Sequence, residues 1–172
     1  MKKIRYGVAM SLDGYIAGPN GEYDWIVHDP EVNFAEIWAQ FDTLLMGCGT
    51  YEPGIAAMGK KAFKGMKTFV ASRTMRQEDH PGVTVISELN RDWISRIRAQ
   101  SGKDIWLFGG GKLFRSLLEL GDVDTVEVHI IPVLLGGGIS FLPPPVQQTT
   151  LKLSSHKVYP TGCVSLFYDV QR

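Results

Sequence analysis

The stretch Ile105-Trp106-Leu107-Phe108-Gly109-Gly110-Gly111-Lys112-Leu113-Phe114 decides how this chain folds. It begins as a short buried strand and continues, after three glycines, with the spacing of an amphipathic helix. Glycines at such a junction let the backbone turn tightly and let a ligand approach exposed N–H groups. Two interpretations are open here: a phosphate site at a helix N-terminus, or a turn that only lets the helix pack on the sheet.

The composition indicates one soluble globular domain over residues 1–172. Of the 172 residues, 44% are hydrophobic and 21% are charged, which is ordinary for a folded domain with a sizeable core. Lysine plus arginine and aspartate plus glutamate both number 18, so the formal net charge is zero. A neutral chain argues against nucleic acid or an anionic membrane as the main partner. A small-molecule ligand is therefore expected.

Cysteine usage and the N-terminus point to a cytoplasmic protein. Cys48 and Cys163 form neither a zinc-binding spacing nor a disulfide framework, so we expect no metal and a reducing compartment. The charged N-terminus is not followed by the apolar segment of a signal peptide. No apolar run approaches the roughly 20 residues that span a bilayer.

Short apolar strands alternate with helical patterns along the chain, which predicts an α/β domain with a largely parallel sheet. The predicted strands and the final antiparallel hairpin cover residues 4–10, 43–46, 67–71, 83–86, 105–108, 123–132, 150–158 and 164–170. Residues 54–65 receive no element.

Two further helices are predicted. One follows Asp29-Pro30, with Asp29 as N-cap and Pro30 at the first helical position. Its aromatic residues are expected in the core: Phe34, Trp38 and Phe41. The other covers residues 90–100, with an apolar face and three solvated arginines: Arg91, Arg96 and Arg98.

Three predicted strands end in residues that can hold a ligand. These ends are Gly47–Thr50, Ser72-Arg73 and Gly109–Lys112. In parallel sheets ligands bind beyond the carboxyl ends of the strands, so the three ends are expected to converge. Glycine N–H groups suit a pyrophosphate, and an arginine can hold two oxygens of a further phosphate. The chain lacks the Rossmann pattern G-x-G-x-x-G after its first strand.

Residues 11–21 form a glycine-rich loop between two turn dipeptides, Asp13-Gly14 and Asn20-Gly21. A loop of this length in a compact domain is usually functional. Its apolar residues, Leu12, Tyr15 and Ile16, favour a flap that covers a ligand over a solvated connection.

These segments resemble the three cofactor-binding segments of the dihydrofolate reductase fold, in order and in spacing. They are Met46–Tyr51, Val70–Arg73 and Phe108–Phe114. Ser11–Ala17 and Pro132–Gly138 are most similar to one branch, the C-terminal reductase domain of the riboflavin-biosynthesis deaminase-reductase and its stand-alone relatives. The resemblance covers nearly the whole chain. It implies a three-layer α/β/α fold with a mostly parallel central sheet and a C-terminal antiparallel hairpin.

Carried over position by position, the resemblance implies an NADPH site. Ala9 would line the nicotinamide, Ser72 and Arg73 the 2′-phosphate, and the glycine segments the pyrophosphate. The implied cofactor residues are Ala9, Gly47, Gly49, Thr50, Ser72, Arg73, Phe108, Gly109, Gly110, Gly111, Lys112 and Leu113. The flap would close over the nicotinamide and exclude water during hydride transfer.

The substrate side departs from dihydrofolate reductases. Those enzymes carry a carboxylate five positions after a loop tryptophan, and here the fifth position after Trp25 is Pro30. Asp29 and Glu31 flank that position and are the candidate substrate-binding carboxylates. Asp13 matches an aspartate of the deaminase-reductase branch and is the candidate catalytic residue. A helix cap, a dipole partner and a turn former remain the alternative roles of these three residues.

Three functions follow from this resemblance. The first is an NADPH-dependent reductase that transfers hydride to a pyrimidine- or pteridine-type substrate, like 5-amino-6-(5-phosphoribosylamino)uracil in riboflavin biosynthesis. The second is a divergent dihydrofolate reductase, and the third is an NADPH-binding protein without turnover. The chain carries no H-x-E or P-C-x-x-C deaminase signature. The resemblance also suggests a homodimer.

Overall fold

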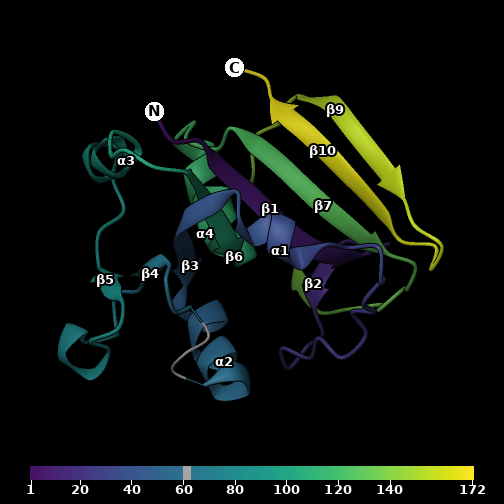
Figure 1. The fold of residues 1–172 in the computed structure, drawn as a ribbon, viewed down its shortest axis with the longest axis horizontal. Coiled ribbons are helices and arrows are strands. Elements are labelled where there is room, and N and C mark those ends of the chain that lie inside the picture. The colour runs from purple at the N-terminus through teal and green to yellow at the C-terminus, as the bar shows by residue number, and fades with distance from the viewer. Residues whose placement is uncertain (60–62) are drawn as a thin grey trace.

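A computed structural model describes residues 1–59 and 63–172 (Figure 1). Its centre is one eight-stranded sheet in the order β5-β4-β3-β6-β1-β7-β10-β9. The strands are β1 Ile4–Ser11, β3 Phe41–Gly47, β4 Lys67–Ala71, β5 Thr84–Ile86, β6 Asp104–Gly109, β7 Thr125–Ile131, β9 Leu151–Val158 and β10 Val164–Val170. In this order, each pair of neighbouring strands from β5 through β4, β3, β6 and β1 to β7 is parallel. Strand β10 is antiparallel to both β7 and β9. The predicted parallel sheet with its terminal hairpin is confirmed.

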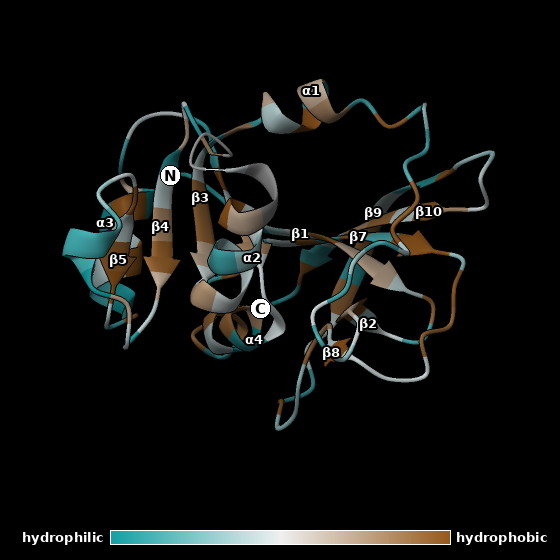
Figure 2. Cartoon of the chain, turned by 90° about the horizontal axis from the view of Figure 1, so that it is seen from below, coloured by the Kyte–Doolittle hydropathy of each residue, from teal (hydrophilic) through white to brown (hydrophobic). Residues whose placement is uncertain are grey.

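Helices lie on both faces of the sheet, which makes three layers. They are α1 Phe34–Trp38, α2 Cys48–Met58, α3 Arg91–Arg98 and α4 Gly111–Glu119. Seen along the sheet, α1 and α4 lie on opposite sides of it (Figure 2). The α/β/α arrangement expected from the resemblance is therefore present.

Each face of the sheet has its own hydrophobic core. The core on the α3 and α4 side includes Tyr6, Ile105 and Phe114, and the Tyr6 and Phe114 rings stack with centroids 3.9 Å apart. The core on the other side joins Met46 of β3 to Tyr51 of α2. Alternate residues of β3, β4 and β6 contribute to the two cores, as strands buried on both faces require.

The predicted flap is partly ordered into strand. β2, Tyr15–Ala17, pairs with β8, Ile139–Ser140, in a separate two-stranded antiparallel sheet. A Cβ on Gly138 would lie 2.2 Å from the Ala17 carbonyl oxygen, so this pairing needs glycine there. The loop is thus held by a segment more than a hundred residues later in the chain.

The prediction for the first helix was wrong. The helix begins at Phe34, and its N-cap is Asn33, whose side chain accepts a hydrogen bond from the Glu36 N–H. Asp29 does not cap it, because its carboxylate is bonded to Thr161 on a distant turn. Phe34 is 46% exposed, so it is not a core residue.

Two other predictions need correction. Residues 48–58 form α2, where no helix was predicted, although the segment contains Pro53 and two glycines, Gly49 and Gly54, which have low helix propensity. The burial of Tyr51 in the core overrides that weak local propensity, and residues 60–62 of the unassigned stretch lie outside the described residues. Arg98 is 7% exposed, not solvated. Arg98 lies one turn after buried Ile94, and its guanidinium pairs with Asp124 at 2.8 Å.

Candidate functional site

The three ligand-competent strand ends converge at one edge of the sheet. Gly47, the last residue of β3, is paired with Ala71, the last residue of β4. Met46 is paired with Gly109, the last residue of β6. Because β4, β3 and β6 are adjacent and end in register, their following loops lie side by side. We call this region, the ends of β3, β4 and β6, the cofactor side.

The three glycines at the junction of β6 and α4 differ in what they contact. A Cβ on Gly109 would lie 2.9 Å from the Thr50 hydroxyl oxygen, and a Cβ on Gly110 would lie 3.4 Å from it. A Cβ on Gly111 would instead lie 2.4 Å from the Ser140 carbonyl oxygen. Gly109 and Gly110 therefore let the Thr50 side chain lie directly against the main chain, whereas Gly111 lets α4 pack on β8. The packing interpretation is confirmed at Gly111, and the phosphate site stays a prediction for Gly109 and Gly110.

Two helices begin at the cofactor side. The N-caps of α2 and α4 are Gly47 and Gly110, and neither helix end has a side-chain cap. The first N–H groups of a helix have no partner inside it and carry the positive end of the helix dipole. An anion such as a pyrophosphate is the chemistry that these donors suit.

The turn after β4 presents a cation at the same edge. The buried Ser72 hydroxyl accepts hydrogen bonds from the N–H groups of Thr74 and Met75, at 3.2 and 3.1 Å. This use of the hydroxyl fixes the turn. The exposed Arg73 side chain makes no hydrogen bond or ion pair with the described residues, so its guanidinium is presented for an anionic ligand. Ser72 shapes the turn and Arg73 extends from it.

Strands β1 and β6 part at the centre of this edge. Their pairing ends at Tyr6 and Leu107, yet β1 continues to Ser11 against β7. The Trp106 indole N–H donates to the Gly7 carbonyl oxygen at 3.0 Å, where the two strands separate. A Cβ on Gly7 would lie 2.8 Å from the indole nitrogen, so glycine is required there. Ala9, the predicted nicotinamide residue, follows on the same face of β1.

The remaining predicted cofactor residues are also at the cofactor side. Gly49 lies in the first turn of α2 and meets no atom within 4 Å of an added Cβ. Phe108 is half-buried, with its ring edge-on to Trp106 at 5.0 Å. Lys112 is exposed and Leu113 is buried in the core under α4.

The other half of the edge, the ends of β1 and β7 with the loop around Asp29, we call the substrate side. Asp29 is 2% exposed, and its carboxylate accepts hydrogen bonds from the Thr161 hydroxyl at 2.6 Å, the Thr161 N–H at 3.2 Å and the Glu31 N–H at 2.8 Å. The bond from the Thr161 hydroxyl is the main reason that the pKa of Asp29 lies below its usual value. Glu31 is exposed and lies 3.7 Å from the Lys157 ammonium. Both candidate carboxylates are thus bonded to the protein itself.

Asp13 connects two loops at the rim of the substrate side. Its carboxylate accepts hydrogen bonds from the Ser11 hydroxyl at 2.7 Å and from the N–H groups of Leu135 and Gly136 at 3.1 and 2.7 Å. The bond from Ser11 does most to lower the pKa of Asp13. The structure gives this carboxylate a positioning role, and its catalytic role stays a prediction.

The sequence pattern missed one group at the substrate side. His129 of β7 is paired with Ala9, and its Nδ1 lies 2.8 Å from the Ser165 hydroxyl of β10. Burial lowers the pKa of the His129 imidazole, and the Asp29 carboxylate offsets part of that effect. The alternation of residues 123–132 places His129 and Glu127 on one face of β7, a signal that could have identified it.

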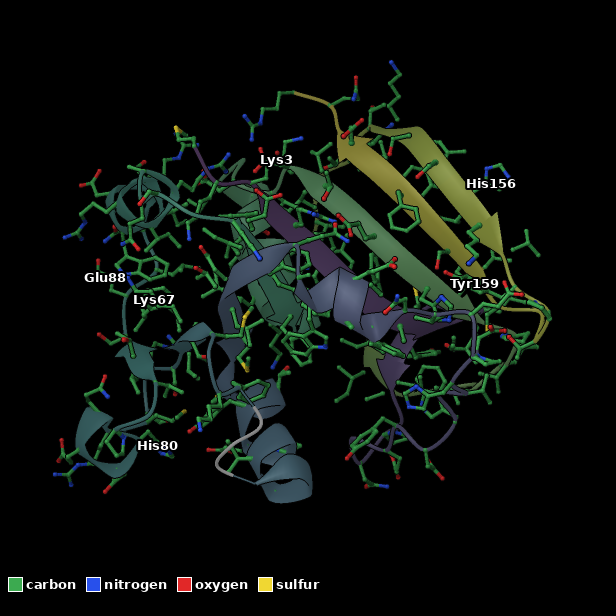
Figure 3. The ribbon with its side chains drawn as sticks, in the orientation of Figure 1. Lys3, Lys67, His80, Glu88, His156 and Tyr159 are labelled. Atoms are coloured by element: carbon green, nitrogen blue, oxygen red, sulfur yellow. The ribbon has the colours of Figure 1, made fainter. Side chains whose placement is uncertain are left out.

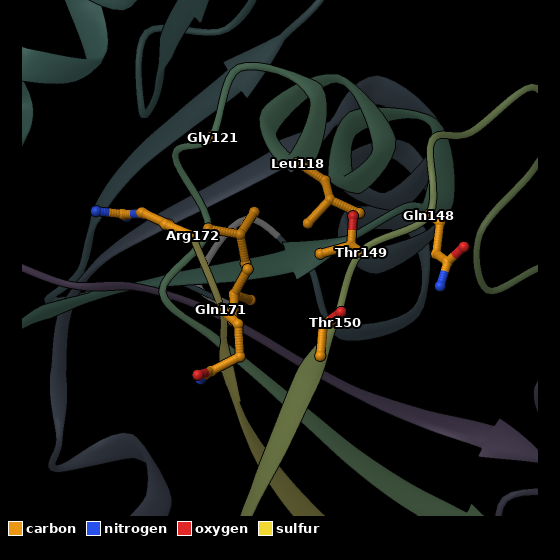
Figure 4. A pocket seen from close by; sticks show the side chains of 9 residues that line it. Leu118, Gly121, Gln148, Thr149, Thr150, Gln171 and Arg172 are labelled. Atoms are coloured by element: carbon orange, nitrogen blue, oxygen red, sulfur yellow. The ribbon is translucent and has the colours of Figure 1, made fainter.

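The hollow drawn in Figure 4 lies away from these groups. Its volume is about 310 Å³, and it lies where β10 ends and β9 begins. Its lining mixes apolar residues such as Leu118 and Val170 with polar ones such as Thr149 and Gln171. The strand ends and helix N-termini described above are at the opposite end of the sheet, so we place the site there.

Comparisons with known proteins agree with this fold. The family model of the RibD C-terminal domain matches residues 2–165. The Bacillus subtilis (strain 168) protein YyaP is 30% identical over 97% of this chain and 94% of its own length.

Three solved structures share the fold. A putative riboflavin biosynthesis protein from Shewanella sp. PV-4 has a TM-score of 0.84 at 24% identity, covering all of both chains. Enterococcus faecalis dihydrofolate reductase, complexed with NADP(H) and RAB-propyl, has a TM-score of 0.71 at 18% identity, covering 99% of this chain and 97% of that one. A Thermotoga maritima diaminohydroxyphosphoribosylaminopyrimidine deaminase/5-amino-6-(5-phosphoribosylamino)uracil reductase has a TM-score of 0.70 at 17% identity. The match covers 99% of this chain and 57% of that one. The dihydrofolate reductase-like fold predicted from the sequence is confirmed.

Proposed function

The chain belongs to the RibD C-terminal domain family, and on that premise we propose that it is an NADPH-dependent reductase. Its proposed substrate is a phosphorylated pyrimidine such as 5-amino-6-(5-phosphoribosylamino)uracil, which the name of the Thermotoga maritima protein specifies for that protein. The observation that carries the proposal is the cofactor side. There, three strand ends in register bring to one edge two helix N-termini without a side-chain cap and Arg73, which has no partner among residues 1–59 and 63–172.

The residues present fit this cofactor. The first N–H groups of α2 and α4 and the Thr50 hydroxyl, which lies against Gly109, would bind the pyrophosphate. The Arg73 guanidinium would bind the 2′-phosphate, which NADH lacks. Ala9 would contact the nicotinamide where β1 parts from β6. When bound, NADPH would supply the hydride.

The dihydrofolate reductase alternative has less support on the substrate side. A carboxylate that holds a pterin must be free to bond it, and Asp29 already accepts three hydrogen bonds from the protein. Glu31 is exposed and faces Lys157. A phosphorylated pyrimidine needs no such carboxylate.

Binding and turnover test the proposal separately. Calorimetric titration of the wild-type protein with NADPH and with NADH should show tighter binding of NADPH. NADPH oxidation should then follow addition of 5-amino-6-(5-phosphoribosylamino)uracil and not of dihydrofolate. Failure to bind NADPH would refute the cofactor assignment. Binding without oxidation of NADPH by either compound would favour the NADPH-binding protein without turnover.

We also propose that the chain forms a homodimer through β9. This strand is at the edge of the sheet, every one of its residues is exposed, and three are large and apolar: Leu151, Leu153 and Val158. Exposed apolar edge strands tend to pair with another chain. Light scattering should give a dimer mass for the wild type and a smaller mass for Leu153→Lys. A monomeric wild type would refute this proposal.

No helix in the described part of the chain is long and apolar enough to cross a bilayer.

A further inference from the structure

His129 is part of a polar group that the reaction proposed above does not yet use. Its Nδ1 lies 2.8 Å from the Ser165 hydroxyl oxygen, which lies 3.4 Å from the Tyr159 hydroxyl. The Tyr159 ring is edge-on to the imidazole, with centroids 5.2 Å apart. Figure 3 shows Tyr159 at the end of β9, where the hairpin turns. Residues from β7, β10 and the turn after β9 thus hold the imidazole in one orientation.

The hydrogen bonds leave one ring nitrogen free. Nε2 of His129 makes no hydrogen bond with any residue in the described ranges 1–59 and 63–172, and it is not among their fully buried unpartnered atoms. The two nitrogens of an imidazole point away from each other. With Nδ1 directed at β10, Nε2 is directed to the side of β7 where β1 lies. The β1 residue in register with His129 is Ala9.

We infer that His129 is a substrate-binding residue whose Nε2–H donates a hydrogen bond to the heteroatom of the C=O or C=N group that is reduced. This inference rests on the proposed reductase function, because it places the substrate beside Ala9. Ser165 is the positioning residue. We assign its single hydroxyl proton to the shorter contact, 2.8 Å to Nδ1, and not to the 3.4 Å contact with the Tyr159 hydroxyl, which leaves the proton of the neutral ring on Nε2.

The chemical step balances with this assignment. Hydride from NADPH forms a new C–H bond at the carbon of the double bond, and the π electrons move to the heteroatom. The Nε2–H of His129 stabilises the negative charge that develops there, and solvent water supplies the proton that completes the product. A neutral imidazole is a hydrogen-bond donor in this role and gives up no proton. One such preorganised donor typically contributes about 10²- to 10³-fold in rate.

The surroundings keep the ring neutral. Burial lowers the pKa of His129 below its usual value of 6.5, so the neutral form dominates at neutral pH. The charged groups near it are the Asp29 carboxylate, which opposes the shift, and the Lys157 ammonium, which lies over the Tyr159 ring. On β7 itself, the Glu127 carboxylate is paired with Arg5 at 2.6 Å.

The first test reads the proton directly and needs no substrate. Nitrogen-15 NMR of histidine-labelled protein at neutral pH should show His129 as the Nε2–H tautomer, with the signal assigned by its loss in His129→Gln. Ser165→Ala should convert this signal to a tautomer mixture, and Ser165→Thr should restore it. An Nδ1–H tautomer in the wild type would overturn the inference, because Nε2 would then be an acceptor.

The second test measures NADPH oxidation by 5-amino-6-(5-phosphoribosylamino)uracil. His129→Ala should lower kcat by about 100-fold, and His129→Gln, which keeps a side-chain N–H, should retain more activity. The matched control is His156→Gln, on β9. Light scattering should first show that this variant keeps the wild-type mass, and it should then turn over like wild type. Wild-type turnover by His129→Ala would overturn the inference. If the wild type does not bind NADPH or use this substrate, the proposed function fails, and the tautomer measurement still decides the state of His129.

Discussion

On the cofactor side, each candidate ligand group comes from the few residues that directly follow its strand. On the substrate side, the contacts join distant parts of the chain: Asp29 to Thr161 across 132 positions, and Asp13 to Gly136 across 123. The cofactor side can therefore be recognised in the sequence from short motifs, namely the glycine runs and Ser72-Arg73. The second side exists only once the terminal hairpin and the loop after β7 have docked. Changes on the two sides should accordingly have different consequences.

The largest expected effect is on cofactor binding by Gly109→Ala. The new methyl would lie 2.9 Å from the Thr50 hydroxyl oxygen. Loss of two hydrogen bonds to a charged phosphate, at about 1.5 kcal/mol each, would weaken NADPH binding roughly 100-fold. Titration calorimetry measures it, with Gly82→Ala as control because a methyl there meets no atom within 4 Å. Unchanged affinity would remove Gly109 from the cofactor side.

Gly111→Ala should separate packing from binding within the same triplet. Its methyl would lie 2.4 Å from the Ser140 carbonyl oxygen, a main-chain atom that cannot swing away. Such overpacking costs about 1–3 kcal/mol in the free energy of unfolding. Urea denaturation of this variant should show the loss. If Gly111→Ala unfolds at the same urea concentration as the wild type, the packing role of Gly111 is wrong.

Arg73→Ala should change which cofactor is preferred. A charge-assisted bond to the 2′-phosphate contributes about 1.5–3 kcal/mol, so the preference for NADPH over NADH should fall about tenfold or more. The ratio of the two dissociation constants measures it. Arg76→Ala is the matched control and should keep the wild-type preference, because Arg76 is three positions from Arg73 and is paired with Glu78. An NADPH preference that survives in Arg73→Ala would move the 2′-phosphate elsewhere.

The smallest expected effect is a change in acid stability at Asp29. Because the folded protein holds the pKa of Asp29 below 3.8, the carboxylate stabilises the fold above that value. The contribution is lost as the pH falls from 3.8 through the lower, folded-state pKa. Asp29→Asn should lower the Tm at neutral pH by a few degrees and weaken its decline below pH 3.8. Thr161→Val should behave alike, since it removes the same bond. Identical profiles of variant and wild type would show that Asp29 is free for a substrate.

Local pattern predicted most of the elements and failed where packing overruled it. No helix was predicted within residues 48–58, which contain two glycines and a proline, yet they form α2 with Tyr51 buried in the core. Asp29-Pro30 has the pattern of a helix start, yet its carboxylate bonds Thr161 instead. In both places a contact absent from the neighbouring sequence was stronger than local preference.

By itself, the sequence determined the α/β class, the parallel sheet and the three strand ends that bear glycine, hydroxyl and guanidinium groups. It could do so because strand periodicity and turn chemistry are properties of adjacent residues. Only the tertiary structure decided that Gly109 and Gly110 lie against Thr50 while Gly111 packs on β8. It alone turned His129 toward Ser165 and bonded Asp29 to Thr161. Which hydrogen-bonding groups of a side chain stay free depends on the residues that the fold brings beside it. Here Ser165 is 36 positions from His129, and Thr161 is 132 positions from Asp29.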